Sequence, residues 1–485
     1  MILILLYTFL ISGILIIFCI DKKKDFLIRF FSLLVSSLVL IVSTLLLLFF
    51  KTNTLSNQQN CFVCFNLHVL NFSTNFGLDS LSLLFLVLSS LLIFLCLIFI
   101  WNEINYKNYA ISLLLIELFL LLIFSSLDLF IFYIFFEAIL IPMFLIIGFW
   151  GSRNRKVRAV FLFFFYTLCG SLLFLVGIFY LYILVGSCSI EYIRVFCFSL
   201  IEQQILWIAF FLSFASKIPM FPFHVWLPEA HVEAPTVGSV LLAGILLKLG
   251  VYGFLKYSLV LFPYASLFYS PAVYTFSIIG IIYASFCAIR QTDLKRIIAY
   301  SSISHMNLIV LGIFSFNLLG LQGSIFQSLS HGFVSGGMFF LIGIIYARYH
   351  TRFLFYYGGL AQTMPLFSCF FLIFTMANIA LPGTSSFSGE FLLLLGIYKT
   401  NFLSGILSST GVIFCGAYSL WLCNKILFTN LKIFYTFKFL DIDLREGFIL
   451  LPLFILIIIL GFVPKFIFSL TNFTCLDILF ELNQI

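Results

Sequence analysis

Seven ionisable side chains occur within long apolar stretches of this 485-residue chain. They are Glu117, Glu137, Lys217, Lys248, His305, His331 and Glu390. A lysine or an acid at the centre of a membrane-spanning helix costs about 3 kcal/mol, so the five charged members together cost ~15 kcal/mol, comparable with the stability of a whole fold. This cost predicts that the groups have a function or bind one another. Buried ion pairs that only fix helix packing are the alternative interpretation.

Proton exchange is the chemistry that these residue types favour. A carboxylate stabilises a nearby ammonium, whereas desolvation favours the neutral amine, so a buried lysine beside a glutamate can store a proton and release it. At 1.5 Å per residue, Glu137, Lys217 and Lys248 lie about 12, 20 and 18 Å into their expected helices, near the middle of a hydrocarbon core roughly 30 Å thick. The sequence therefore predicts that these three residues exchange protons at one level of the membrane.

Two histidines extend this prediction, because an imidazole accepts and donates protons near neutral pH. The polar neighbours expected on the same helical faces are Ser301 and Ser302 for His305, and Ser324, Gln327 and Ser328 for His331. Neither helix has a His/Glu pair at i, i+4, which disfavours a metal site. A proton relay is favoured, and histidines that only pack by hydrogen bonding are the alternative.

The composition indicates a membrane protein. Hydrophobic residues make up 63% of the chain and charged residues 9%, against roughly 25% charged residues in soluble domains. The net charge of +7 is scattered without a basic face that carries stacking aromatics, so we expect membrane lipid and no nucleic acid as a partner. We predict an all-α polytopic fold with about fourteen transmembrane helices. The expected spans are 2–20, 30–50, 80–101, 110–127, 129–150, 159–186, 204–227, 236–262, 271–289, 297–316, 319–347, 364–398, 404–427 and 447–470.

Loop charges give these spans an orientation. Eighteen of the lysines and arginines fall in the odd-numbered loops, and four fall in the even-numbered loops. Positively charged loops remain on the cytoplasmic side, or on the matrix side of an organelle. The odd-numbered loops are therefore predicted on that negative side, and both termini on the opposite, positive side.

The seventh and twelfth spans are broken by similar sequences, SKIPMFPFHVWLP (216–228) and ALPGTSSFSGE (380–390). Proline removes a backbone donor, and non-helical backbone at membrane depth survives only inside protein or beside a watered cavity. The breaks lie five spans apart, and an odd number of spans inverts the second unit relative to the first. We therefore predict N-terminal helices 1–3 in residues 1–109, two inverted five-helix repeats in 110–262 and 263–427, and helix 14 with the tail in 428–485.

The twelve cysteines give little guidance to chemistry. Most of them, Cys415 included, fall in apolar segments and are predicted to act as small hydrophobic residues. Cys61 and Cys64 form an isolated C-x-x-C without the four ligands of a structural zinc site, so a local disulfide or free loop thiols are the alternatives. A disulfide between Cys188 and Cys197 is equally open.

Five blocks of the chain carry a family signature. The longest is WLPEAHVEAPTVGSVLLAGILLKLGVYG (226–253). The others are FFEAILIPMFLIIGFWG (135–151), DLKRIIAYSSISHMN (293–307), QSLSHGFVSGGMFFLIG (327–343) and GTSSFSGEFLLLLG (383–396). Together they resemble the antiporter-like, proton-translocating membrane subunits of respiratory complex I.

The resemblance implies roles for the intramembrane residues. Glu137 and Lys217 match the family's pair that modulates a central lysine, and Lys248 matches that lysine. Glu390 matches the charged residue of the broken twelfth span, where sister subunits tend to carry lysine, so it favours one branch of the family. His305 and His331 match the family's connecting polar axis. Glu117 matches a further acidic position in the fourth span.

The resemblance also implies a proton pump that has no redox site or cofactor on this chain. The complex as a whole would use NADH, FMN, iron–sulfur clusters and ubiquinone in other subunits. The implied partners are the other membrane-arm subunits of complex I, sister antiporter-like subunits among them. A mitochondrial inner membrane is favoured over a bacterial plasma membrane or a plastid thylakoid. The alternatives are a sodium/proton antiporter subunit of a multi-subunit cation antiporter and a purely structural membrane spacer.

The predicted orientation can be tested by cysteine labelling. An Arg153→Cys variant places a thiol in the loop after the fifth span, and we expect it to react with a membrane-impermeant maleimide only from the negative side. A Ser199→Cys variant, in the loop before the seventh span, should react only from the positive side. The parent chain supplies the background of the native thiols. Labelling of position 153 from the positive side would refute the orientation.

Overall fold

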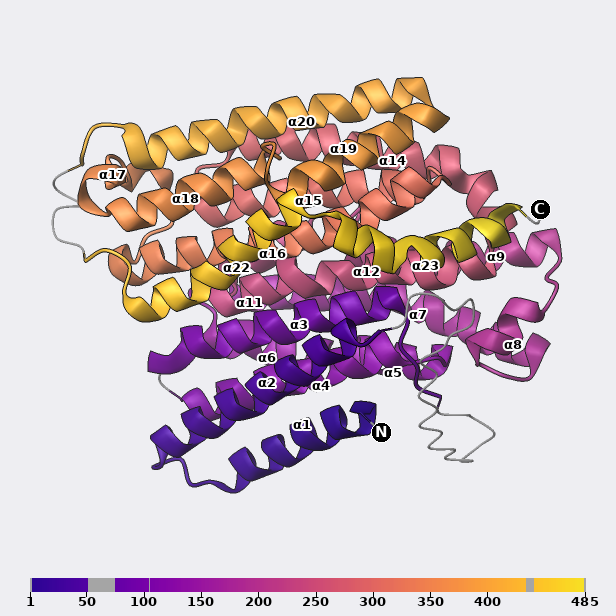
Figure 1. Cartoon of the computed structure of the whole chain (residues 1–485), viewed down its shortest axis with the longest axis horizontal. Helices are drawn as coiled ribbons and strands as arrows, with labels where there is room; N and C mark the ends of the chain where they lie inside the picture. The colour runs from indigo at the N-terminus through magenta and orange to yellow at the C-terminus, as the bar shows by residue number, and fades with distance from the viewer. Residues whose placement is uncertain (1, 51–74, 104, 433–439, 484–485) are drawn as a thin grey trace. The chain divides into compact units, whose positions relative to one another are not determined.

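The computed structural model describes residues 2–50, 75–103, 105–432 and 440–483, and it is all-helical (Figure 1). In these ranges extended backbone pairs only at isolated bridges, such as Phe76 with Ser126. Eleven helical stretches of the described residues, some made of consecutive helical segments, are long and apolar enough to cross a membrane, and Leu3–Cys19 and Pro365–Asn378 are shorter apolar helices. The predicted all-α polytopic class is therefore confirmed. Cys61 and Cys64 lie outside the described residues, and Cys188 and Cys197 are free thiols.

The chain forms two compact units. Unit 1 comprises Met1–Ser216, Tyr252–Phe268 and Leu470–Ile485. The helices that lie wholly or mostly in it are α1 (Ile2–Cys19), α2 (Asp25–Leu48), α3 (Ser80–Phe99), η1 (Ile100–Asn102), α4 (Tyr106–Ser125), α5 (Leu129–Ala138), α6 (Leu140–Trp150), α7 (Lys156–Val185), α8 (Ile190–Val195), α9 (Leu200–Lys217), η3 (Phe254–Ser258), α13 (Leu259–Leu261) and α23 (Lys465–Asn483).

Unit 2 comprises Lys217–Val251 and Tyr269–Ser469. Its helices are α10 (Trp226–Glu233), α11 (Thr236–Leu241), η2 (Leu242–Leu246), α12 (Leu247–Gly253), α14 (Pro263–Arg290), α15 (Leu294–Ile313), α16 (Leu318–Tyr349), η4 (Leu354–Tyr356), α17 (Leu360–Thr363), α18 (Pro365–Asn378), α19 (Ser385–Thr400), α20 (Phe402–Cys423), η5 (Asn424–Phe428) and α22 (Leu444–Phe462). In Figure 1 the orange helices α18, α19 and α20 of this unit run beside one another.

The two predicted helix breaks are present. α9 ends at Lys217, and regular helix resumes with α10 at Trp226, beyond two prolines. α18 ends at Asn378 and α19 begins at Ser385, because Pro382 lacks the N–H that would continue the ladder to Asn378. The interruption therefore comes shortly before Glu390 in the chain.

Other irregularities in the helices were not predicted. The expected fifth span is divided at Ile139, because the ring and missing N–H of Pro142 disrupt the turn around Ala138. The expected eighth span contains the π-helical segments η2 and η3, which lie on either side of Lys248 in sequence. The last span was predicted to end at residue 470, but α22 ends at Phe462 and the separate helix α23 follows. Pro464 explains this boundary, since it has no N–H to continue α22.

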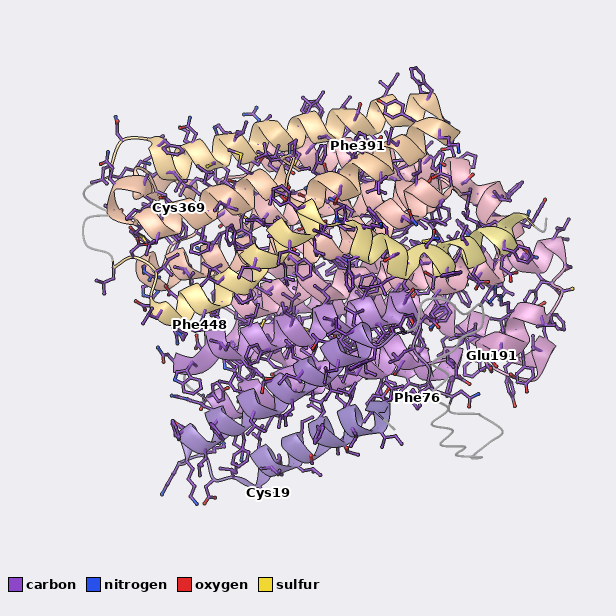
Figure 2. The ribbon with its side chains drawn as sticks, viewed as in Figure 1. Cys19, Phe76, Glu191, Cys369, Phe391 and Phe448 are labelled. Carbon is purple, nitrogen blue, oxygen red and sulfur yellow. The ribbon has the colours of Figure 1, made fainter. Side chains whose placement is uncertain are left out.

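Large apolar side chains cover the outside of unit 2. Phe391 of α19 and Phe448 of α22, both labelled in Figure 2, are 51% and 69% exposed. Aromatic surface of this extent would be unfavourable in water, whereas hydrocarbon solvates it. The outer face of unit 2 therefore suits a lipid environment.

The interior of unit 2 is built around α16, which packs against α15, α18, α19 and α22. The contact with α19 is especially close, since a Cβ atom added to Gly389 would lie 3.0 Å from the Cα of Gln327. Small residues permit such close approach of helices in membranes. Gly389 therefore lets α16 and α19 approach where Gln327 and Glu390 meet.

The close contact predicts a stability difference between two glycine variants. Gly389→Ala should lower the thermal midpoint of the detergent-solubilised complex, because the added methyl group overpacks the helix crossing by about 1–3 kcal/mol. Gly416→Ala is the matched control on α20, where an added Cβ meets only the Ile379 side chain at 3.9 Å. The control should be neutral or slightly stabilising, since alanine favours helix. Equal midpoints for the two variants would contradict the packing argument.

Candidate proton-transfer site

Lys248 is held between a backbone carbonyl and a histidine. It lies in α12, directly after η2, and its side chain is completely buried. Its Nζ donates to the carbonyl oxygen of Ala243 and lies 2.9 Å from Nδ1 of His331 on α16. π-Helical turns inside α-helices are frequent at functional sites. The irregular helix thus presents a buried amine to an imidazole within unit 2.

His305 and Glu390 form a second contact in the same unit. His305 Nδ1 on α15 lies 3.0 Å from Glu390 Oε1 on α19, and both side chains are almost fully buried. Gln327 on α16 donates from Nε2 to the same Glu390 oxygen at 3.1 Å. The Ser330 hydroxyl donates to Gln327 Oε1, which fixes the direction of the amide. Three helices therefore meet at one carboxylate.

The two contacts are adjacent but are not joined by a direct hydrogen bond between the histidines. The ring centroids of His305 and His331 are 5.7 Å apart, and the planes are inclined by 53°. Gln327 and His331 stand one turn apart on α16, so this helix contributes to both contacts. The order along the site is Lys248, His331, His305, Glu390.

The serines expected to extend this row bond instead to their own helices. Ser301 and Ser302 donate to the carbonyl oxygen of Ile298, and Ser324 and Ser328 donate to carbonyl oxygens three residues before them. A hydroxyl engaged in this way is not oriented toward a neighbouring histidine. These serines therefore satisfy backbone carbonyl groups of their own helices.

The other predicted residues lie in different parts of the fold. Glu117 on α4 of unit 1 is fully buried, and neither carboxylate oxygen has a hydrogen-bond partner among the described residues. Glu137 lies in α5 of unit 1, one residue before the end of that helix, and is partly buried. Lys217 ends α9 at the first break, belongs to unit 2 and is 4% exposed. Unit 2 therefore holds the lysine–histidine–glutamate row, and unit 1 holds Glu117 and Glu137.

Sequence reasoning missed His231, although it lies within the longest signature block. It is 0% exposed, and its ring stacks on Phe339 of α16 with centroids 4.7 Å apart. Neither ring nitrogen has a hydrogen-bond partner in the described part of the chain. The sequence AHVEAPT (230–236) could have indicated this residue. It places His231 four residues before Pro235, and a histidine close to a helix-breaking proline is as strong a candidate for a polar site as His305.

A buried charge cluster was also missed, because its two cations were counted only as loop charges. Lys295 is 3% exposed, and its Nζ donates to the carbonyl oxygen of Ala234 at 2.7 Å. Arg352 is 1% exposed, with its guanidinium 3.6 Å from Glu233 and 3.7 Å from Asp293. These four residues bring two cations and two acids together inside unit 2.

The arrangement can carry protons in chemical terms. The row contains an amine, two imidazoles and a carboxylate, each of which can exist with or without its proton. Two of its three steps lie within hydrogen-bond reach, and the third requires a ring rotation or a bridging water. Together with the helical fold, the site defines a polytopic membrane protein with a buried row of titratable groups.

Comparison with known proteins assigns this class to a family. A family model described as "NADH:quinone oxidoreductase/Mrp antiporter, TM" matches residues 126–415. The chain is 49% identical over 473 residues to NADH-ubiquinone oxidoreductase chain 4 of Chondrus crispus, which covers 96% of this chain and 95% of that one. It is 46% identical over 457 residues to the chain 4 of Arabidopsis thaliana, with 94% and 92% covered. The chain therefore belongs to the NADH:quinone oxidoreductase/Mrp antiporter family, and within it to the chain 4 group.

Solved structures agree with this assignment. A chain in the structure of respiratory complex I from Thermus thermophilus with bound NADH superposes with a TM-score of 0.88 at 28% identity, covering 99% of both chains. A chain of the Mrp complex from Dietzia sp. DQ12-45-1b superposes with a TM-score of 0.85 at 20% identity, covering 98% of this chain and 97% of that one. The second likeness shows a shared fold alone. The resemblance drawn from the five sequence blocks is confirmed.

Proposed function

We propose that this chain is a proton-translocating membrane-arm subunit of an NADH:ubiquinone oxidoreductase. It is a multi-pass protein of the mitochondrial inner membrane, and its partners are the other membrane-arm subunits. The observation that carries the proposal is the row from Lys248 through His331 and His305 to Glu390. The chain 4 relatives are the reason for assigning the chain to this complex, and the row contains the groups that would transfer protons within it.

Each residue of the row has a proposed role. Lys248 is the central proton store, His331 exchanges its proton, and His305 with Glu390 forms the terminal pair. Glu137 and Lys217 modulate the proton affinity of Lys248, as the resemblance implies. Glu117 is proposed as a further acidic group that takes part in proton transfer.

The driving force in this proposal comes from redox chemistry elsewhere in the complex. NADH, FMN, iron–sulfur clusters and ubiquinone are assigned to other subunits, and this chain carries no cofactor. Moving each proton against 100 mV costs ~2.3 kcal/mol, so the coupling must change proton affinity in the row by at least that amount. A change in the partners of a buried amine or carboxylate is sufficient for such a shift.

We further propose a fourteen-span arrangement with two inverted five-helix repeats. The limits are 110–262 and 263–427, with residues 1–109 before them and 428–485 after them. The support is the pair of broken helices, one after Lys217 and one after Asn378. In inverted-repeat transporters such breaks occupy corresponding positions in the two halves.

A sodium/proton antiporter subunit is the second candidate, since the Mrp likeness extends over almost the whole chain. The two candidates differ in what drives the protons. Oxidation of NADH by the native complex, with proton uptake that does not depend on sodium, supports the first. Sodium-dependent proton exchange without NADH oxidation supports the second.

Lys248→Ala tests the central role. In proteoliposomes that contain the assembled complex, we expect coupled NADH oxidation and proton pumping to fall below about one fifth of the parent rate, because loss of a proton-exchanging group typically costs tenfold or more. Lys399→Ala is the control, as Lys399 is exposed in the last turn of α19. Normal pumping by an assembled Lys248→Ala complex would instead make the chain a structural spacer.

Glu390 separates proton transfer from hydrogen bonding. Glu390→Gln keeps an oxygen that can accept from Gln327 but removes the titrating group, so pumping should fall strongly. Glu390→Asp should retain part of the activity, because a carboxylate survives one methylene shorter. A Gln variant that pumps like the parent, beside an impaired Glu390→Ala variant, would remove Glu390 from the proton path.

A further inference from the structure

Cys415 does more than fill space on α20. It is 4% exposed, in agreement with the prediction of a small hydrophobic residue, but its Sγ also lies near four polar groups, one of which is the Asn378 Nδ2 that donates to it at 3.8 Å. His305 Nε2 is 3.6 Å away, and the carbonyl oxygen of Asn378 is 3.3 Å away. The Tyr418 hydroxyl donates to Sγ at 3.0 Å. The thiol therefore belongs to the polar site.

Both ring nitrogens of His305 are occupied as a result. Nδ1 faces Glu390 at 3.0 Å, and Nε2 faces Cys415 at 3.6 Å. Because the two nitrogens lie on different edges of the ring, rotation toward His331 breaks at least one of these contacts. The orientation of His305 thus depends on α19 and α20 together.

The acceptor at Asn378 exists because of the helix break. In a continuous helix the N–H of residue 382 would donate to the carbonyl oxygen of Asn378, but Pro382 has no N–H. An unsatisfied carbonyl at membrane depth costs free energy, so it requires another donor. The Cys415 S–H can supply it.

A thiol suits both charge states of His305, since it donates one hydrogen and accepts another. When His305 is neutral with its proton on Nδ1, Nε2 is an acceptor and the S–H can point to it. When His305 is an imidazolium, Nε2–H donates to Sγ, and the S–H turns to the Asn378 carbonyl. Tyr418 donates to the sulfur in either case. The Cys415 S–H can therefore turn from His305 Nε2 to the Asn378 carbonyl when His305 becomes protonated, and turn back when His305 loses that proton.

We propose that Cys415 is a positioning residue for proton transfer, which holds His305 in both charge states and links its charge to the broken helix through Asn378. This inference rests on the proposed function. The titratable groups that face His305 are Glu390 from α19, Cys415 from α20 and His331 from α16, and Tyr418 contacts the Cys415 sulfur. Cys415 is the member of this set that also contacts the carbonyl freed by Pro382.

The test compares Cys415→Ala and Cys415→Ser with Cys423→Ala, a control for a buried cysteine two turns later on the same helix. Coupled NADH oxidation and proton pumping are measured in the assembled complex between about pH 5 and 8, where imidazole changes charge. In Cys415→Ala the imidazolium loses its acceptor on Nε2, so the acidic limb of the profile should move down by about one pH unit. Cys415→Ser should restore most of the parent profile, because a hydroxyl also donates and accepts.

A second measurement covers the case in which the alanine variant does not assemble. Infrared difference spectra of the parent complex at high and low pH should contain an S–H stretching change that is absent from Cys415→Ser. Absence of that change from the parent overturns the proposal. A Cys415→Ala profile identical to that of Cys423→Ala does the same. If His305→Ala also pumps like the parent, the proposed proton path itself has failed, and the two failures are thereby distinguished.

Discussion

The contact between Lys248 and His331 is the interaction on which the rest of the row depends. Lys248 Nζ has two acceptors, the Ala243 carbonyl and His331 Nδ1, and an ammonium buried without such partners would cost several kcal/mol. Nδ1 can accept only while it carries no proton. An ammonium on Lys248 and a proton on His331 Nδ1 therefore exclude each other in this geometry. The protonation states of the two residues are therefore coupled.

The second requirement is that a broken helix inside a membrane must satisfy its own backbone. At the end of α18 the Leu381 N–H donates to Met376, and the Ser386 hydroxyl donates to Ala377. Asn378 is reached by Cys415 from α20. The interruption is thus fixed by specific donors, and it holds α19 in the position from which Glu390 meets His305. Cys415 therefore takes part both in satisfying the broken backbone and in the contacts of His305.

The sequence was sufficient to single out the buried ionisable residues that the structure brings together in unit 2. Lys248, His331 and Glu390 stand out because charged and imidazole groups are rare in apolar spans, and the break before α19 follows directly from Pro382. The contacts of these residues could not be predicted from the sequence, since the depth of a residue along its helix does not indicate which neighbouring helix its side chain faces. Depth alone grouped Lys248 with Glu137 and Lys217, whereas its contact with His331 depends on the packing of α16.

Two kinds of feature had no local signal. Nothing in the sequence LLAGILLKLG distinguishes the π-helical segment η2 before Lys248 from ordinary helix. Cys415 resembles any buried cysteine until His305, 110 residues earlier, is placed against it. Lys295 was assigned to a loop because hydropathy ends a span at its first charge, although α15 begins one residue earlier and buries it. Each omission concerns a long-range contact.

The close packing of α16 suggests how the two halves of the row are coupled. His331 and Gln327 stand one turn apart on this helix, and they contact Lys248 and Glu390 respectively. Since a helix moves as a rigid element over one turn, a shift of α16 that lengthens one contact alters the other. Gly389 permits this close packing of α16 and α19, because a Cβ at that position would lie 3.0 Å from the Cα of Gln327. The contacts at the two ends of the row are thus linked through one turn of α16.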